Sequence, residues 1–137
     1  DGYHSDITRM AFLGRPDARY LEIHRLVEDA VQAALEAIRP GTPLRDVDRA
    51  ARGVIERAGY GRHFTHRTGH GIGLSGHEPP SVTHTDPTPL EVGMTFSVEP
   101  GIYLPGAFGV RLEEIVVVTE QGPEVLSRLP REVKALG

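Results

Sequence analysis

Three acidic residues lie in segments that otherwise read as β-strands, where carboxylates are uncommon. They are Asp6, Glu99 and Glu113. Any one of them alone is explained by solvent exposure on an edge strand or by pairing with an arginine. Carboxylates that face one another across a buried sheet would repel and take up protons unless a cation held them together. Because hard cations prefer oxygen ligands, we interpret the three as candidate ligands of a divalent metal ion.

A cluster of histidines could complete such a site. Five of the seven histidines lie between residues 60 and 93, and His66, His70 and His77 fall within twelve residues. Glycines on both sides of His70 allow a metal ion or a substrate to approach the backbone closely. A lone histidine is more often structural, but this concentration favours a functional interpretation. An imidazole ligand shifts the preferred metal toward Mn, Fe, Co or Zn.

Composition excludes several classes of function. The 137 residues suffice for one domain with one core. A net charge of −4 argues against binding to nucleic acid or an anionic membrane, and no apolar run reaches the roughly 18 residues of a membrane span. The absence of cysteine excludes disulfides and thiolate chemistry, and is compatible with a reducing cytoplasm. The stretch Gly71–Gly76 matches a dinucleotide-binding fingerprint, but the following His-Glu-Pro-Pro cannot start the helix that this motif requires.

The elements that position these residues can be predicted from periodicity and turn signals. Strand character runs over residues 3–13, 94–99 and 110–119. A further short strand is expected near Val125-Leu126, after a turn at Gly122-Pro123. Alternation within 110–119 gives two faces that each begin polar and become apolar, as expected where a strand runs from a site into a core.

Two helices are predicted between the first two strands. One has Pro16 in its first turn and ends at Pro40-Gly41; the other has Thr42 as N-cap, Pro43 at its first position and Gly59 as C-cap. We expect an α+β fold in which the helices cover one face of an antiparallel sheet. The apolar helix faces are Val27, Val31, Ala34 and Ile38 in the first helix, and Leu44, Val47, Ala51, Val54, Ile55 and Ala58 in the second.

Five short motifs, in one order, resemble those of the pita-bread metallopeptidases, and the resemblance extends over the whole chain. The Ser-Val-Glu-Pro-Gly-Ile-Tyr and Arg-Leu-Glu motifs look like the Xaa-Pro branch, which contains proline dipeptidase and aminopeptidase P. The resemblance implies the pita-bread (creatinase/aminopeptidase) fold, of which this chain would supply mainly the second half. The motifs are Gly2-Tyr-His-Ser-Asp-Ile-Thr-Arg9, Gly69-His-Gly-Ile-Gly73, His77-Glu-Pro79, Ser97-Val-Glu-Pro-Gly-Ile-Tyr103 and Arg111-Leu-Glu113.

The resemblance also implies a set of five ligands around two divalent metal ions, Mn or Co, with Zn or Fe as alternatives. Asp6 matches a bridging Asp, His70 the single His, Glu99 the first Glu and Glu113 the bridging Glu. A further Asp should lie eleven residues before Asp6, ahead of the first residue of this chain. We therefore expect residues 1–137 to be the C-terminal portion of a catalytic domain that is inactive in isolation, with Asp1-Gly2 as a hairpin turn.

The implied reaction is hydrolysis of the peptide bond preceding proline by a metal-bridging hydroxide. Glu99 would pass a proton to the leaving amine, and His66 and His77 would hydrogen-bond the substrate or the oxyanion. Tyr103 and Arg111 match positions that either support the metal ligands or face the substrate, and the cation at Arg111 could orient Glu113. The implied partner is a peptide with proline at its second position, with no nucleic acid and no membrane involved. A homodimer in the cytoplasm is expected for the full-length protein.

Several alternatives stay open at this point. Methionine aminopeptidases share Gly-His-Gly-Ile-Gly, but usually carry a Cys where Thr68 stands and a longer stretch between the two Glu ligands. Some prolidases place a basic residue just after His-Glu-x-Pro to hold the substrate C-terminus. This chain has Ser81 there, which favours longer substrates or a different carboxylate clamp. A non-catalytic pita-bread binding module and a creatinase-like C–N hydrolase are the rival functions.

Overall fold

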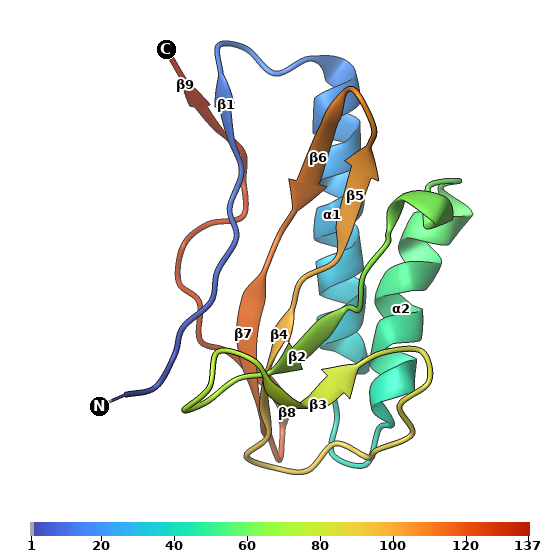
Figure 1. The fold of residues 1–137 in the computed structure, drawn as a ribbon, viewed down its shortest axis with the longest axis vertical. Helices are drawn as coiled ribbons and strands as arrows, with labels where there is room; N and C mark the ends of the chain where they lie inside the picture. The colour runs from blue at the N-terminus through green and yellow to red at the C-terminus, as the bar shows by residue number, and fades with distance from the viewer. Residues whose placement is uncertain (1) are drawn as a thin grey trace.

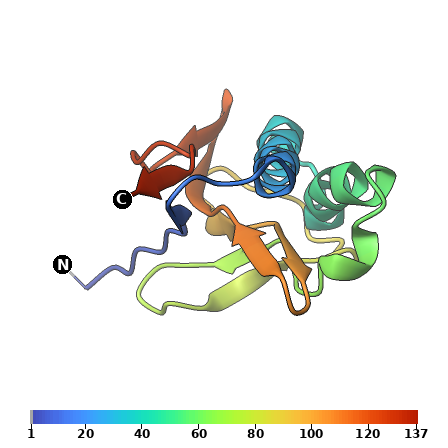
Figure 2. The ribbon, with the colours of Figure 1, turned by 90° about the horizontal axis from the view of Figure 1, so that it is seen from above.

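Two helices lie side by side against one face of a mainly antiparallel sheet (Figure 1, Figure 2). The computed structural model describes residues 2–137, so the predicted turn at Asp1-Gly2 includes a residue outside the described part. The α+β class is therefore confirmed. The elements are β1 Ala11–Leu13, α1 Ala18–Ala37, α2 Leu44–Arg57, the 3-10 helix η1 Gly61–His63, β2 Gly69–Gly71, β3 Glu78–Val82, β4 Thr95–Val98, β5 Gly101–Leu104, β6 Phe108–Arg111, β7 Glu114–Thr119, β8 Gly122–Val125 and β9 Lys134–Leu136.

The main sheet has five strands in the order β3-β2-β4-β7-β8, with every neighbouring pair antiparallel. Strands β5 and β6 form an antiparallel hairpin that continues from β4 and β7 beside α1 (Figure 1). Strands β1 and β9 pair in parallel, which places the C-terminal end of the chain beside β1 (Figure 1). No helix within residues 2–137 has the length and apolar character needed to cross a bilayer.

Helix α1 begins later than the sequence predicts. Asp17 is its N-cap, and the Asp17 carboxylate accepts a hydrogen bond of 2.7 Å from the Tyr20 backbone N–H. Pro16 therefore precedes the cap and does not lie in the first turn. Asp17 takes the cap position because its carboxylate can accept a hydrogen bond from a free N–H of the first turn, and a proline side chain has no acceptor. The helix ends at Ala37, before the predicted Pro40-Gly41.

Helix α2 has Pro43 at its N-cap position, so the predicted Thr42 cap is wrong. The physical reason is a loop that supplies carbonyl acceptors: the Leu44 N–H donates to the Thr88 carbonyl and the Arg45 N–H to the Asp86 carbonyl. These bonds satisfy the first-turn donors that a threonine hydroxyl would otherwise serve. At the other end Gly59 has a φ of +84°, as a residue just beyond a helix C-terminus requires.

The core lies between the two helices and the sheet. The predicted apolar faces are confirmed, with Val54 only partly buried and Ala58 exposed at the end of α2. Sheet residues Phe96, Val98 and Val116 close the core from the other side. The fully buried residues of the helices and of the α1 C-cap, Ile38, include Ile23, Val27, Val31, Ala34, Ile38, Leu44, Val47, Ala51 and Ile55.

The predicted strands are shorter than expected. Only Ala11–Leu13 of the predicted strand 3–13 pairs in a ladder; residues 2–10 form an extended segment held by isolated hydrogen bonds. The predicted strand 110–119 is interrupted between β6 and β7, and Gly122-Pro123 begins β8 instead of forming a turn. As a result Asp6, Glu99 and Glu113 all lie outside strands, at or beyond strand ends.

Candidate metal centre

Glu99 and Glu113 occupy matching breaks in two neighbouring strands. Val98 of β4 pairs with Glu114 of β7, and Gly101 of β5 pairs with Arg111 of β6. Continuing this register through the break places Glu99 directly opposite Glu113. Pro100 has no N–H to donate there, which contributes to the interruption. Two like charges directly opposite each other are unfavourable, so this arrangement favours a bound cation.

The backbone N–H groups at the two breaks turn to other partners. The Glu99 N–H donates to the Thr68 carbonyl (2.8 Å) and the Glu113 N–H to the Thr8 carbonyl (3.2 Å). The first bond ties Glu99 to the residue before β2, and the second ties Glu113 to the N-terminal extended segment. The segments that carry His70 and Asp6 are thereby brought to the same place.

His70 lies in the middle of β2 with its ring buried at 2% exposure. Its Nδ1 lies 3.0 Å from the Gly71 carbonyl oxygen, which can only accept, so Nδ1 carries the proton and Nε2 presents a lone pair. Nε2 lies 3.2 Å from Glu99 Oε1 and 4.0 Å from Asp6 Oδ2. This is the tautomer and orientation that a metal-ligating histidine requires.

The glycines beside His70 serve the packing of the sheet. A Cβ on Gly69 would collide with the Ser97 carbonyl oxygen, and one on Gly71 would collide with the Pro79 carbonyl oxygen. The sequence analysis attributed these glycines to close approach of a metal ion or substrate. What approaches is the backbone of the neighbouring strands, which holds the His70 ring at its depth in the sheet.

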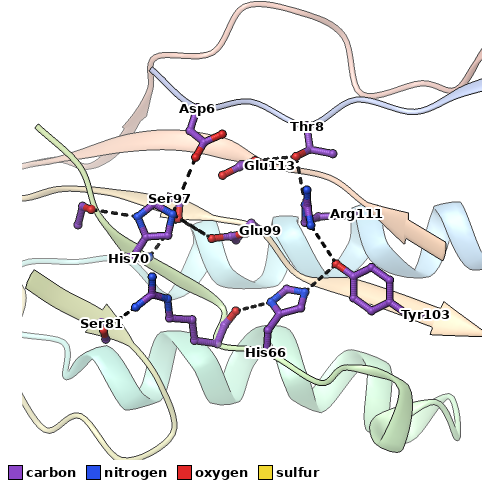
Figure 3. Close-up of polar contacts among 12 residues, drawn as sticks. Asp6, Thr8, His66, His70, Ser81, Ser97, Glu99, Tyr103, Arg111 and Glu113 are labelled. Atoms are coloured by element: carbon purple, nitrogen blue, oxygen red, sulfur yellow. Dashed lines mark hydrogen bonds and ion pairs between the residues drawn. The ribbon is translucent and has the colours of Figure 1, made fainter. Parts of the chain in front are cut away.

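All four predicted ligands converge (Figure 3). Potential ligand atoms of His70, Glu99 and Glu113 lie within 4.8 Å of one another, and so do those of Asp6, His70 and His77. The Asp6 side chain is 42% exposed, so the centre opens to solvent on that side. His77 is also exposed, and its ring packs edge-on against His70 with centroids 3.9 Å apart.

The electrostatics of this cluster fit a cation. Burial raises the pKa of Glu113, the nearby Glu99 and Asp6 carboxylates raise it further, and the Thr8 hydroxyl and Arg111 oppose the rise. One imidazole nitrogen and three carboxylates make a donor set suited to divalent ions such as Mn, Co, Fe or Zn. The residues present therefore fit a metal ion, with Asp6, His70, Glu99 and Glu113 as the groups that could hold it.

Replacing Glu113 with Gln is expected to stabilise the metal-free protein at neutral pH and to remove its stabilisation by metal. The raised pKa means that Glu113 binds its proton more tightly in the folded protein than in the unfolded chain. Ionised Glu113 therefore lowers the free energy of unfolding, and this loss appears as the pH rises through the pKa of the folded state. Gln carries no charge, yet its amide oxygen can accept the hydrogen bond that Thr8 Oγ1 donates to Glu113 Oε2. Thermal unfolding in EDTA and in Mn, from acidic to neutral pH, measures both effects. A lower melting temperature for E113Q in EDTA at neutral pH would contradict the prediction.

A chain of hydrogen bonds links Glu113 to the residues predicted to lie on the substrate side (Figure 3). Thr8 Oγ1 donates to Glu113 Oε2 (2.6 Å), and Arg111 donates to Thr8 Oγ1 (3.1 Å) and to the Tyr103 hydroxyl (3.4 Å). The Tyr103 hydroxyl lies 2.8 Å from His66 Nε2. His66 Nδ1 is hydrogen-bonded to the Arg67 carbonyl. Both nitrogens of His66 therefore have hydrogen-bond partners, and the ring orients the Tyr103 hydroxyl.

Two hydroxyl residues of the candidate centre were not predicted from the sequence. Thr8 connects Glu113 to Arg111, and Ser97 Oγ accepts from the His70 N–H and donates to Glu99 Oε1, both at 3.0 Å. Both lie within the motifs quoted for the resemblance, two residues from a predicted ligand. Their type gave no signal, because serine and threonine are common in strands and loops without any such role.

A buried ion pair on α2, also missed, holds the loop that carries His66. Arg52 makes bonds of 3.0 and 3.1 Å to the fully buried Asp48, and also donates to the Phe64 and His66 carbonyls. Asp48 Oδ1 accepts from the buried Thr68 hydroxyl at 2.7 Å. Because the Thr68 carbonyl accepts from the Glu99 N–H, this network extends from α2 to the metal centre.

Replacing Thr68 with Val is expected to lower the free energy of unfolding by about 1–2 kcal/mol, because Asp48 loses a buried hydrogen-bond donor while the shape of the side chain is kept. Urea unfolding measures the change. Thr65→Val is the matched control, since Thr65 is exposed in the same loop. Equal losses for the two variants would show that the Thr68–Asp48 bond contributes nothing.

Comparison with known proteins places this chain in a family. The model of metallopeptidase family M24 matches residues 1–120. A probable dipeptidase PepE from Mycobacterium bovis is 48% identical over 132 residues, which are 96% of this chain and 35% of that protein. The chain thus spans about a third of the length of the relatives that it matches.

Two solved structures share the fold closely. An X-Pro aminopeptidase from Thermotoga maritima has a TM-score of 0.96 at 43% identity, covering 98% of this chain and 38% of that one. A Xaa-Pro dipeptidase from Bacillus anthracis has a TM-score of 0.96 at 44% identity, with the same coverage. The predicted pita-bread fold and the resemblance to Xaa-Pro peptidases are thereby confirmed. With its motifs, its fold and its match over residues 1–120 in agreement, the chain belongs to metallopeptidase family M24.

Proposed function

We propose that this chain carries most of the metal centre of a peptidase that hydrolyses the peptide bond preceding proline. The observation that carries the proposal is the convergence of His70, Glu99 and Glu113 within 4.8 Å at matching strand breaks, with Asp6 beside them. The names of the relatives, X-Pro aminopeptidase and Xaa-Pro dipeptidase, support the choice of bond. An X-Pro bond is a tertiary amide and has no N–H, so a dedicated site is needed to recognise it.

Asp6, His70, Glu99 and Glu113 would hold the metal ions, Mn or Co in the first instance. When bound, two divalent ions supply an acidified water nucleophile and stabilise the negative charge that develops on the scissile carbonyl. In this proposal Glu99, which is 15% exposed and has one carboxylate oxygen fixed by a hydrogen bond from Ser97, passes a proton to the leaving amine.

The substrate-side residues have separate roles in this proposal. His77 is exposed beside His70 and can hydrogen-bond the substrate or the oxyanion. His66 and Arg111 hold the Tyr103 hydroxyl from two sides, which fixes the position of its oxygen. These roles follow from position and hydrogen-bond partners.

We further propose that residues 1–137 form the C-terminal portion of the catalytic domain of a longer enzyme. The support is the share of each relative that the chain covers, about a third. A fifth ligand, an Asp eleven residues before Asp6, then belongs to the preceding segment. The homodimer and the cytoplasmic location remain predictions of the sequence.

The deciding experiment is metal analysis and peptide hydrolysis with the full-length protein, supplied with Mn or Co. Xaa-Pro dipeptides or longer Xaa-Pro peptides should be cleaved before proline, and EDTA should stop the reaction. Absence of bound metal together with absence of Xaa-Pro hydrolysis would favour the non-catalytic binding module. Turnover confined to a non-peptide C–N bond, as in creatine, would favour the creatinase-like alternative.

A further inference from the structure

Arg67 lies between two grooves, each lined by one of the histidines predicted to contact substrate. One groove, of about 790 Å³, is lined by His66 together with Arg49, Arg52 and the loop at 83–85. The other, of about 710 Å³, is lined by His77 and residues 78–81. Arg67 is the residue that the two linings share. Its side chain is half-buried between the two histidines predicted to contact substrate.

The Arg67 guanidinium is held close to His70. Arg67 NH1 donates to Ser81 Oγ at 3.2 Å. Ser81 is the cross-strand partner of His70 in the β2–β3 pair, so the two side chains lie on one face of the sheet. Directly opposed residues of an antiparallel pair have Cβ atoms about 4.5–5.5 Å apart. The guanidinium is therefore anchored next to the imidazole predicted to bind metal.

Arg67 also differs from the other arginines around the centre. Arg9 pairs with Glu114 and Arg52 with Asp48, while Arg111 faces Glu113 and Glu99. Within residues 2–137, no carboxylate oxygen lies within 4.0 Å of the Arg67 guanidinium, and its side-chain hydrogen bond goes to a neutral hydroxyl. Its planar fork thus keeps N–H donors suited to a carboxylate.

We propose that Arg67, oriented by Ser81, binds the free C-terminal carboxylate of the substrate and makes the enzyme a dipeptidase. The proposal rests on the proposed function above. In an Xaa-Pro dipeptide the carboxylate lies one residue beyond the scissile bond, a span of about 3.5 Å. A guanidinium anchored beside a metal ligand matches that short span. Ser81, which by itself favoured longer substrates or another clamp, then serves as the support of that clamp.

The test compares an Xaa-Pro dipeptide with its C-terminal amide in the full-length, metal-loaded enzyme. The wild type should prefer the free acid in kcat/KM by about tenfold to a hundredfold, the range for a charge-assisted hydrogen bond. Arg67→Met should reduce this acid-to-amide ratio to near one. Arg67→Lys should give an intermediate ratio, because it keeps the charge but loses the fork.

Arg49→Met is the matched control, because Arg49 lines the same groove but pairs with Asp46 on the surface. It should leave the acid-to-amide ratio at the wild-type value. A wild-type ratio near one, or an unchanged ratio in R67M, would overturn the assignment of Arg67.

A binding measurement separates this proposal from the proposed function. Calorimetry should show that L-proline binds the wild type at least about tenfold more tightly than L-prolinamide, and that R67M loses the difference. If neither peptide is cleaved, the proposed function fails, and the calorimetry still decides the role of Arg67. Equal binding of L-proline and L-prolinamide by the wild type would count against Arg67 as a carboxylate site.

Discussion

Replacing His70 with Ala is expected to abolish metal binding and Xaa-Pro hydrolysis in the full-length enzyme. His70 belongs to both groups of potential ligands in the described chain and is the one buried imidazole among them. A bound cation would offset the repulsion between the Glu99 and Glu113 carboxylates. Without His70, the site loses the nitrogen that helps to bind this cation. Loss of a residue that only supports a metal ligand costs about 10–100-fold in affinity or activity, so loss of the ligand should exceed about 100-fold.

Two histidine variants make this prediction specific. His84→Ala should leave metal content unchanged, because His84 is exposed and belongs to neither group of potential ligands in the described chain. His77→Ala should retain metal and lose turnover, since we place His77 toward the substrate. Metal content after dialysis and kcat/KM are the measurements. A metal-replete H70A protein would show that the ligand assignment is wrong.

Replacing Arg9 with Met is expected to give the largest loss of stability. Arg9 makes two bonds of 2.8 and 2.9 Å to Glu114, which is buried at 2% exposure, and further bonds to the Thr8, Glu113 and Leu129 carbonyls. The substitution leaves the buried Glu114 charge with Arg131 as its remaining partner. We expect a loss of about 3 kcal/mol, the low end of the range for breaking a buried ion pair.

The same substitution should also weaken metal binding. Arg9 fixes the extended segment that carries Asp6 and Thr8, and it bonds the Glu113 carbonyl at 2.6 Å. Urea unfolding and metal titration measure the two effects. Arg131→Met should cost less, because Arg131 makes one bond to Glu114. If R9M is no less stable than Arg49→Met, which removes an exposed pair, the structural role assigned to Arg9 is wrong.

The helices and the class of fold were predictable because their signal is local. An apolar residue every three or four positions marks the buried face of α1 and α2, and these faces pack as predicted. Helix starts were less predictable. The N–H donors of α2 find carbonyls at Asp86 and Thr88, some forty residues away in sequence, and no local pattern reports such partners.

The strands were only partly predictable, and β2, β3, β5 and β9 were not predicted. The predicted strand 94–99 stops at Val98, and the predicted strand 110–119 is interrupted at Glu113. The interruption arises because the Glu99 and Glu113 N–H groups bond to Thr68 and Thr8 instead of to each other's strand. The tendency to form a strand can be read from one segment, whereas a hydrogen-bonded ladder depends on two segments that pair.

The sequence by itself determined which residues could bind metal. Asp6, His70, Glu99 and Glu113 follow from residue type, spacing and the order of the motifs, and the structure brings them together as expected. Only the tertiary structure decided what surrounds them: Thr8 and Arg9 reach Glu113 and Glu114 across more than 100 residues, and Arg67 meets Ser81 across a strand pair. Whether a residue can bind a metal ion depends on the type of its side chain, which is known from the sequence. The residues that hold these candidate ligands in place depend on strand register and packing, which arise only when distant segments come together in the fold.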